Sequence, residues 1–361
     1  MLLNPRLPAD RLQIVQNGML AAIQRRNADP SRLASRKLNE VLYAGTRRGY
    51  ALQSGDVNAI TPELLRRELN RRLQAKDLYA TASGDLTGLR LSERLNTIVT
   101  RFPGTAVSAA DDRDSSRGLQ NANAGQTNVS AAGYAVVGSA PASQQLRGRI
   151  LLVNKPAAQA VVQIAGRLPA RRSADMYALQ TGNYILGGGS FNSRLTREIR
   201  VQRGLAYFAY SYNQFDAGGG RFVAGAGTRS FLAHQTLGLM YTTIASMHAN
   251  VSAGDLRLAK DAILNSLAFQ FDSPEDAVFQ AVRNDLHGMP AGYLVGFPQK
   301  VRALSADQLS AVARRYQQPQ NLWTVIVGPA ALKEKLEALR PVVVIEPEDT
   351  IESIRIAGRG N

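Results

Sequence analysis

Between residues 147 and 250, apolar and polar positions alternate in ways that predict strands and helices in turn. Four short segments have the apolar runs or the two-residue alternation of strands: residues 149–154, 160–166, 204–215 and 221–227. Three longer segments repeat apolar side chains every three or four positions, as amphipathic helices do: residues 173–186, 191–202 and 232–248. This order of elements predicts an α+β fold in which helices flank a sheet.

An internal repeat relates the beginning of the chain to its end. Each copy has an amphipathic helix, a Gly-Tyr loop, a short helix capped by Thr61 or Ser305, and a strand-like segment, LYATASG or LWTVIVG. The helices before the two copies, residues 11–24 and 256–269, also match. A repeat of this length predicts two homologous modules. Matching residues stand 244 positions apart: Pro30 and Pro274, Leu42 and Leu286, Leu65 and Leu309, Leu78 and Leu322, and Gly84 and Gly328.

Only the second copy follows a block of strands and helices, which begins near Arg147. The same block before the first copy would need roughly a hundred residues ahead of Met1. The first module is therefore expected to lack its amino-terminal half, because the chain is a carboxy-terminal piece or because that module is naturally reduced. The predicted segments are the rest of the first module at 1–104, a flexible Ser-, Ala-, Asn- and Gly-rich linker at 105–146, the complete second module at 147–345, and a tail at 346–361 with a disordered end, IAGRGN.

Composition and charge exclude few classes of function. The chain has 361 residues, of which 45% are apolar, as is ordinary for a protein with a sizeable core. Its formal net charge is +15, and 36 of its 43 basic residues are arginine. Such a surface could attract nucleic acid, anionic membranes or acidic peptides. A genome rich in G and C would explain the same composition, because the arginines are scattered and no basic run exceeds two residues.

Several kinds of chemistry have no support in the sequence. Without cysteine there is no disulfide, thiolate metal site or cysteine nucleophile. His234, His248 and His287 are 14 and 39 positions apart, so neither HExxH nor HxxEH occurs, and no metal site is expected in this chain. No G-x-S-x-G elbow occurs. The chain has no apolar run of membrane-spanning length, and its first residues do not read as a signal peptide.

The glycine stretch from Leu186 to Ser190 allows two interpretations. Three glycines that open a helix can hold a phosphate, because helix amino ends favour anions. However, no Gly-Lys-Ser/Thr follows, and Asn192 stands where the third glycine of G-x-G-x-x-G would be. We therefore favour a tight turn between two helices that requires positive φ. The glycines are Gly187, Gly188 and Gly189.

The helix predicted at 191–202 and the strand after it bring two polar side chains close in sequence. Tyr207 follows Arg200 by seven positions, just past a helix break at Gly204. An arginine fork and a tyrosine hydroxyl aimed at one carbonyl could position a peptide and stabilise developing negative charge. A surface arginine beside a packing tyrosine is the alternative. On the helix, Phe191, Leu195 and Ile199 predict a buried stripe, and Arg194, Arg197 and Arg200 lie on another face.

These residues resemble the insulinase family of metallopeptidases, which includes pitrilysin and the mitochondrial processing peptidase. The resembling motifs are YILGGGSFNSRLTREIRVQRGLAY and, between Ser273 and Pro329, FDSPEDA, MPAGYL, VRALSADQL and NLWTVIVGP. The resemblance covers about residues 9–100 and 147–335. It implies a pair of similar domains, each an antiparallel sheet flanked by helices, which close like a clamshell around a peptide.

The resemblance also implies roles for individual residues. The family's arginine–tyrosine pair, which grips substrate and supports the transition state, matches Arg200 and Tyr207, with Gly187–Gly189 as further candidate substrate-binding residues. The family's zinc motif, HxxEH, lies in the first half of the first domain, for which this chain has no counterpart. The helix that supplies a glutamate ligand matches residues 9–26, where no acidic residue follows Asp10.

The resemblance therefore predicts a zinc-free, substrate-binding subunit or fragment of an insulinase-family peptidase. It would be inactive alone, would bind a peptide or protein substrate, and would depend on zinc held by an HxxEH-containing partner subunit. One alternative is a noncatalytic scaffold or binding protein on the same fold. Another is nucleic-acid binding through charge, for which no recognition motif is present. Because many bacterial relatives are exported, the periplasm is favoured over the cytoplasm.

Overall fold

The structure, a computed structural model, describes the chain except for residues 1–4, 75–77, 79–81, 104–140, 250, 291 and 355–361. Most of the predicted linker, residues 79–81 of the segment LYATASG and the predicted disordered end IAGRGN lie outside the described residues. The strands are β1 (Ile150–Asn154), β2 (Gln159–Leu168), β3 (Ala206–Asp216), β4 (Gly219–Arg229), β5 (Trp323–Gly328) and β6 (Val342–Ile345).

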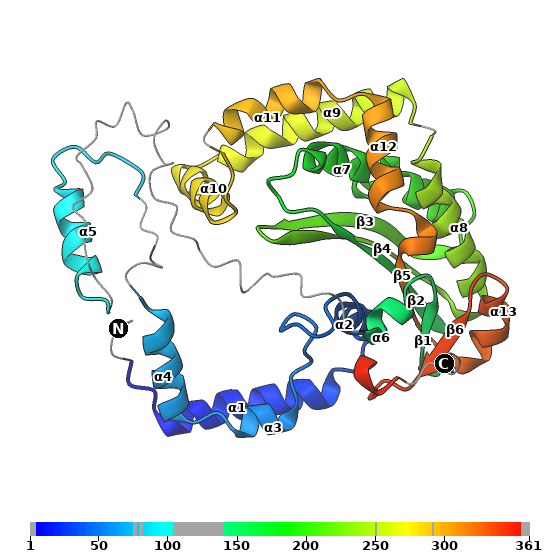
Figure 1. The fold of residues 1–361 in the computed structure, drawn as a ribbon, viewed down its shortest axis with the longest axis horizontal. Coiled ribbons are helices and arrows are strands. Elements are labelled where there is room, and N and C mark those ends of the chain that lie inside the picture. The colour runs from blue at the N-terminus through cyan, green and yellow to red at the C-terminus, as the bar shows by residue number, and fades with distance from the viewer. Residues whose placement is uncertain are drawn as a thin grey trace. The chain divides into compact units, whose positions relative to one another are not determined.

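Helices make up most of the remaining described residues (Figure 1). Those in the first part of the chain are α1 (Ala9–Arg25), α2 (Pro30–Leu42), α3 (Ser54–Asn58), α4 (Pro62–Arg72), α5 (Leu91–Val99) and α6 (Pro141–Gln145). Those in the second part are α7 (Asp175–Asn183), α8 (Ala233–Ser246), α9 (Ala253–Ala268), α10 (Pro274–Leu286), α11 (Tyr293–Arg302), α12 (Ala306–Tyr316) and α13 (Lys333–Glu337).

The strands form one six-stranded mixed sheet in the order β3-β4-β2-β5-β1-β6. The first four strands in this order are antiparallel neighbours, whereas β1 is parallel to both β5 and β6. The four strands predicted between residues 149 and 227, and the strand in LWTVIVG, are confirmed. The sequence patterns did not predict β6.

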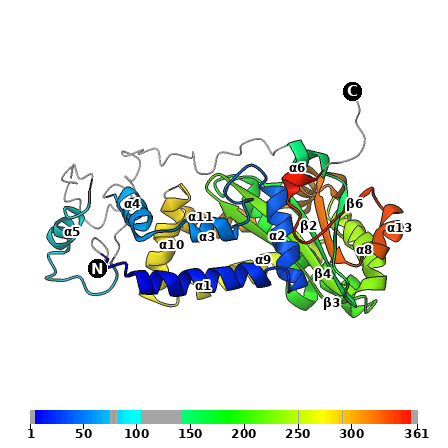
Figure 2. The same cartoon turned by 90° about the horizontal axis from the view of Figure 1, so that it is seen from below.

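Helices cover both faces of the sheet, as the α+β prediction requires. On one face, α7, α8 and α12 bury side chains such as Leu179, Met240 and Leu309 against the strands. On the other face, α2 lies along the sheet and buries Leu33 and Leu38 (Figure 2). Helix α2 belongs to the first copy of the repeat, so a helix of one copy covers the sheet of the other.

Three pairs of helices stand at the offset that the repeat predicts. Helices α2 and α10 each have 13 residues and begin 244 positions apart, and the same offset relates α4 to α12 and the starts of α1 and α9. The predicted caps also form: the side chain of Thr61 accepts a hydrogen bond from the backbone N–H of Leu64, and that of Ser305 from Gln308, each at 3.2 Å.

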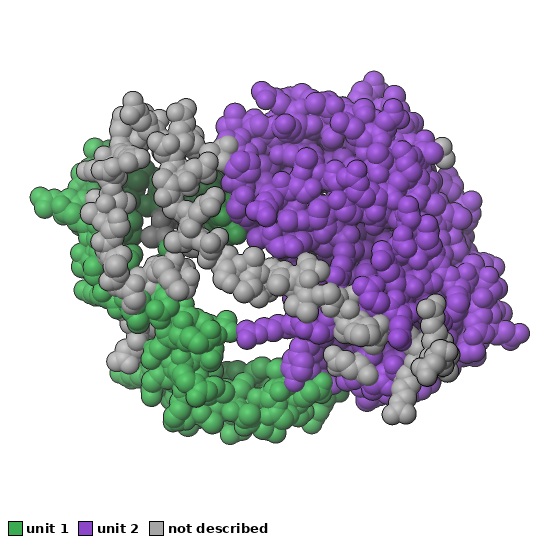
Figure 3. Space-filling model, viewed as in Figure 1, with its two compact units in different colours: residues 1–25, 52–126, 268–286 green, residues 26–51, 127–267, 287–361 purple. Residues whose placement is uncertain are grey.

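The chain divides into two compact units that interleave in sequence (Figure 3). One unit consists of residues 1–25, 52–126 and 268–286, and the other of residues 26–51, 127–267 and 287–361. The second unit contains the whole sheet together with α2. The first unit contains α1, α3, α4, α5 and α10, and its described residues include no strand.

Candidate functional site

The glycine stretch lies in a turn that packs against strand β3. Helix α7 continues into a π-helical turn, η3 (Tyr184–Gly188), and a Cβ atom at Gly187 would lie only 2.3 Å from the backbone N of Ser211. A Cβ at Gly188 would lie 2.7 Å from the Asn183 side chain. The stretch is therefore glycine-rich because the backbone of this turn approaches its neighbours, including strand β3, too closely to leave space for side chains.

The expectation that these glycines require positive φ is wrong. Among the described residues of this turn, the positive φ falls on Ser190, at 53°. Gly189 has a φ of −85°, which any residue can adopt. A side chain at Gly189 is excluded by lack of space, because a Cβ there would lie 2.7 Å from the carbonyl oxygen of Tyr184.

The helix predicted to start at Phe191 instead starts three residues later. Residues Ser190–Asn192 form a short 3-10 turn, η4, and Ser193 is extended with ψ at 149°. This break removes Phe191 from the register of the following helix, so its side chain is 64% exposed, whereas Leu195 and Ile199 are fully buried. The prediction of a buried Phe191 is wrong. The helical segment ends in a second π-helical turn, η5 (Thr196–Val201).

Arg194 and Arg200 of this helical segment have different surroundings. Arg194 is buried, and its Nη2 donates to Asp255 Oδ2 at 2.8 Å while Nη1 donates to Ser246 Oγ at 3.0 Å. Arg200 is exposed, and its guanidinium lies over the ring of Phe191 at 5.4 Å from the ring centre. No described carboxylate lies within ion-pair distance of Arg200. Arg200 is thus a cation that remains available to a ligand.

Tyr207 owes its orientation to an irregularity in β3. Ala206 pairs with Thr228 and Phe208 pairs with Gly227, so Tyr207 is an extra residue at a β-bulge. Bulges re-aim a side chain, and they are common beside functional sites. Tyr207 is 51% exposed and lines a hollow of about 600 Å³. The hollow is also lined by Ala158, Gln159, Arg229, Ser230, Phe231, Pro329, Ala331, Leu332 and Lys335.

The turn between Arg200 and Tyr207 is fixed by the backbone. Gly204 has a φ of 59°, its N–H donates to the Arg200 carbonyl at 3.2 Å, and the N–H of Leu205 donates to the Ile199 carbonyl at 2.9 Å. Tyr207 lines the hollow, but Arg200 is not among its lining residues; Arg200 instead rests on Phe191. The two residues therefore flank one rigid turn without sharing this hollow.

Sequence reasoning missed the residues around Tyr207 that carry charge and apolar surface. Arg229 ends β4, the exposed Phe231 follows it, and Lys335 lies in α13. An available signal was Phe231, a large apolar residue between the predicted strand 221–227 and the predicted helix 232–248. Lys335 could not have been found this way, because α13 follows β5, and only the antiparallel pairing of β5 with β2 brings the end of β5 to this side of the sheet.

The described residues contain no cluster of three or more His, Asp or Glu side chains that could hold a metal ion. His234 lies in α8, whereas His248 lies beyond its end and its Nε2 is 3.2 Å from the carbonyl oxygen of Gln317. Within the described parts of the chain, no helix combines the length and apolar character needed to cross a membrane.

Comparison with known families decides the assignment. Residues 59–263, more than half of the chain, match the family described as the peptidase M16 inactive domain. The chain belongs to the M16 peptidase family. The matched range includes the glycine stretch, Arg200 and Tyr207, whereas the resembling motifs between Ser273 and Pro329 lie beyond it.

Curated M16 relatives are longer than this chain. An uncharacterized zinc protease of Streptomyces coelicolor is 29% identical over 181 residues, which are 50% of this chain and 34% of that protein. An uncharacterized zinc protease of Mycobacterium tuberculosis is 24% identical over 200 residues, which are 54% of this chain and 44% of that protein. The chain thus matches less than half the length of these relatives.

Solved structures support the fold over nearly the whole chain. A peptidase M16 inactive domain from Pseudomonas fluorescens superposes with a TM-score of 0.71 at 23% identity, covering 91% of this chain and 72% of that one. A protease from Helicobacter pylori superposes with a TM-score of 0.65 at 16% identity, covering 89% of this chain and 72% of that one. At these identities the likeness establishes the fold.

Proposed function

We propose that this chain is the substrate-binding, zinc-free part of an M16 metallopeptidase, in which Arg200 and Tyr207 hold the peptide backbone. The observation that carries the proposal is the bulge at Tyr207, which turns its hydroxyl-bearing side chain into a hollow bordered by Arg229 and Lys335. Zinc and the base that activates water would come from a partner subunit that contains HxxEH.

The chemistry of the two side chains suits a peptide carbonyl. The tyrosine hydroxyl donates one hydrogen bond, and the guanidinium of Arg200, which has no described carboxylate partner, offers a fork of N–H donors. Negative charge develops on the carbonyl oxygen when water attacks the peptide, and donors placed in advance stabilise that charge. Phe231, which is exposed beside Tyr207, supplies apolar contact for a substrate side chain.

Gly187, Gly188 and Gly189 belong to the proposed site through the backbone. By allowing η3 to approach β3 closely, they fix the strand from which Tyr207 projects. A side chain at Gly187 would push η3 and β3 apart near Ser211 and would disturb the alignment of Tyr207 with its substrate.

A scaffold or binding protein on the same fold is the second candidate. The observation that favours it is the position of Arg200 over Phe191, outside the hollow that Tyr207 lines. If the pair never acts together, assembly with a partner should not depend on either side chain.

The test is reconstitution with a purified HxxEH-containing M16 subunit from the same organism, followed by cleavage of a quenched fluorescent peptide. The isolated chain should contain no stoichiometric zinc and should not cleave the peptide. In the reconstituted pair, Arg200→Ala and Tyr207→Phe should each lower the rate by about 10²-fold, as loss of an oxyanion donor does. Arg203→Ala, which removes an exposed arginine bonded to Glu198, serves as the matched control and should leave the rate unchanged.

Two results would reject the proposal. One is a chain that binds zinc and cleaves peptides alone. The other is a reconstituted pair whose cleavage rate does not respond to Arg200→Ala or Tyr207→Phe. Full assembly combined with unchanged activity of both variants would favour the scaffold.

A further inference from the structure

A second hollow lies in the unit that contains the sheet, on the face of the sheet that α2 covers. It has a volume of about 470 Å³ and is formed by α2, the segment 48–51 and side chains of β2 and β3. Neither Arg200 nor Tyr207 lines it, so the hollow is separate from the site proposed above. Its lining residues are Ser31, Arg32, Ser35, Arg36, Asn39, Glu40, Arg48, Gly49, Tyr50, Ala51, Gln163 and Tyr210.

An aromatic ladder leads out of this hollow along β3. Phe208, Tyr210 and Tyr212 alternate along the strand and therefore share one face. Their rings stack, with centroids 5.9 Å apart for Phe208 and Tyr210 and 6.1 Å apart for Tyr210 and Tyr212. Tyr210 lines the hollow, while Phe208 and Tyr212 are each 38% exposed. The ladder is thus a partly open apolar platform continuous with the hollow.

Two glycines of β4 give the ladder its flat shape. A Cβ at Gly225 would lie 2.7 Å from the ring of Tyr210, and a Cβ at Gly227 would lie 2.4 Å from the ring of Phe208. Because neither glycine has a side chain, both rings pack directly against the backbone of β4. At the end of the ladder, the guanidinium of Arg221 lies 5.8 Å from the centre of the Tyr212 ring.

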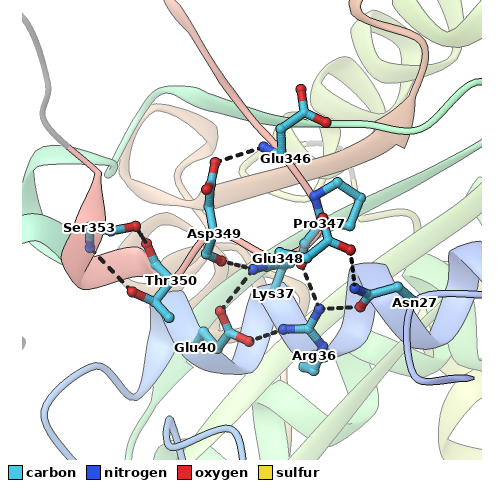
Figure 4. Close-up of polar contacts among 10 residues, drawn as sticks. All are labelled: Asn27, Arg36, Lys37, Glu40, Glu346, Pro347, Glu348, Asp349, Thr350 and Ser353. Carbon is cyan, nitrogen blue, oxygen red and sulfur yellow. Dashed lines mark hydrogen bonds and ion pairs between the residues drawn. The ribbon is translucent and has the colours of Figure 1, made fainter. Parts of the chain in front are cut away.

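The hollow carries a surplus of positive charge. Among the described lining residues the one carboxylate, Glu40, pairs with Arg36 and with the ammonium of Lys37. That ammonium also donates a hydrogen bond to a backbone carbonyl of the carboxy-terminal segment (Figure 4). Arg48 pairs with Asp216 at 2.7 Å. Arg32 is exposed and has no described carboxylate within ion-pair distance. Arg32 is therefore the cation of the hollow that can take a ligand's carboxylate.

The hollow also contains an acceptor without a partner. Gln163 is only 3% exposed, its Nε2 donates to Ser35 Oγ at 2.9 Å, and its side-chain amide also hydrogen-bonds the hydroxyl of Tyr210. Its Oε1 atom has no hydrogen-bond partner among the described residues. A buried acceptor of this kind costs free energy until a donor reaches it, and a peptide N–H is such a donor.

The edge of β3 offers no comparable place for a peptide. The carbonyl of Ala209 accepts from Thr196 Oγ1 at 2.9 Å, the carbonyl of Ser211 accepts from Asn183 Nδ2 at 3.3 Å, and Gly187 packs against the N of Ser211. A strand added at this edge would displace all three contacts. The aromatic face is the accessible surface of β3.

We propose that the hollow and the ladder bind an acidic peptide segment. Its carboxylate pairs with Arg32, a neighbouring aromatic or aliphatic side chain lies on Tyr210 and Tyr212, and a backbone N–H donates to Gln163. A nucleic acid would use the same kinds of groups, but it needs several unpaired cations along its phosphates. The other arginines that line the hollow, Arg36 and Arg48, are paired with carboxylates, which leaves one unpaired cation among the lining residues and not a row of them.

The test is fluorescence anisotropy of the purified full chain at 150 mM salt with a labelled octapeptide, Gly-Ser-Phe-Asp-Glu-Phe-Gly-Ser. Arg32→Glu should weaken binding at least tenfold, because it places a like charge beside the peptide carboxylates. Arg257→Glu makes the same charge change on an exposed part of α9 and should alter the affinity less than twofold. Tyr212→Ser should weaken binding about fivefold, as loss of one stacking surface does. Circular dichroism checks that each variant is folded.

Two altered peptides and one nucleic acid complete the experiment. Replacing Asp and Glu by Asn and Gln, or both Phe by Ser, should weaken binding to the unaltered chain about as much as the corresponding protein variant does. The proposal is overturned if Arg32→Glu and Arg257→Glu weaken binding equally, if the Phe-free peptide binds as tightly as the parent, or if no binding is detected at 1 mM. Tighter, steeply salt-dependent binding of a labelled single-stranded dodecanucleotide would also overturn it. None of these readouts depends on peptide cleavage or on Arg200 and Tyr207.

Discussion

Leu42 and Leu286 end two helices of equal length, 244 positions apart, yet Leu42 is fully buried and Leu286 is 51% exposed. The difference follows from what each helix covers. Helix α2 lies on the sheet, where Leu42 joins the cluster that includes Val161 and Val325. The unit that contains α10 has no strand among its described residues, and Phe279 on the same helix is 75% exposed. Equivalent sequences thus have different packing.

The two leucines should therefore respond differently to truncation. Leu42→Ala removes buried methyl groups and should lower the free energy of unfolding by about 2–5 kcal/mol. Leu286→Ala, the matched control, should change it by less than about 0.5 kcal/mol. Urea denaturation followed through the fluorescence of Trp323, which belongs to the same cluster as Leu42, measures both values. Equal losses for the two variants would contradict the assignment of α2 to the sheet.

Gly187 lies where η3 meets β3. In Gly187→Ala the new methyl group would lie 2.3 Å from the backbone N of Ser211, so the turn or the strand must shift. We expect a loss of about 1–3 kcal/mol in the free energy of unfolding, typical of overpacking.

Gly182, in α7, provides the matched control for this change. A Cβ there would meet only the Cε of Met247, at 3.7 Å, and alanine favours a helix more than glycine does. Gly182→Ala should therefore be neutral or should stabilise the protein by up to about 1 kcal/mol. Thermal unfolding of both variants decides the point: if Gly187→Ala melts no lower than Gly182→Ala, the close approach at Ser211 is not a constraint.

The sequence predicted those features that depend on local pattern. The repeat anticipated the equivalence of α2 and α10, and the caps at Thr61 and Ser305 form as expected because an N-cap needs only a side-chain oxygen three residues before a backbone N–H. The apolar runs located five of the six strands. The sequence also placed Arg200 and Tyr207 on either side of a break at Gly204, where the structure has a left-handed residue.

Other features depend on contacts between distant segments and could not be read from local pattern. Nothing in α2 specifies which sheet it covers, and Phe191 fits a helical stripe even though an extended residue at 193 separates it from the helix. The bulge that turns Tyr207 exists only through pairing with β4. Lys335 reaches the hollow through the position of α13 after β5.

Lys37 is a fully buried lysine on α2 (Figure 4). Burial lowers the pKa of its ammonium from the ordinary 10.5, and nearby Glu40 opposes that shift only in part. Between the lowered pKa and 10.5, the folded protein binds fewer protons than the unfolded chain. The free energy of unfolding should therefore gain a contribution that rises with pH across this window.

Two variants at Lys37 isolate this contribution from other titrations. Lys37→Met cannot be protonated, and Lys37→Arg cannot lose its proton in this range, so both should lose the slope. Urea unfolding at several pH values from 7.5 to 9.5 should show the unaltered protein gaining stability relative to both variants as the pH rises. The window stops at 9.5 because burial raises the pKa of Tyr241 above 10.0, which makes stability fall with pH in all three proteins at higher values. Parallel stability curves for the three proteins would mean that Lys37 is not held in an environment that disfavours its charge.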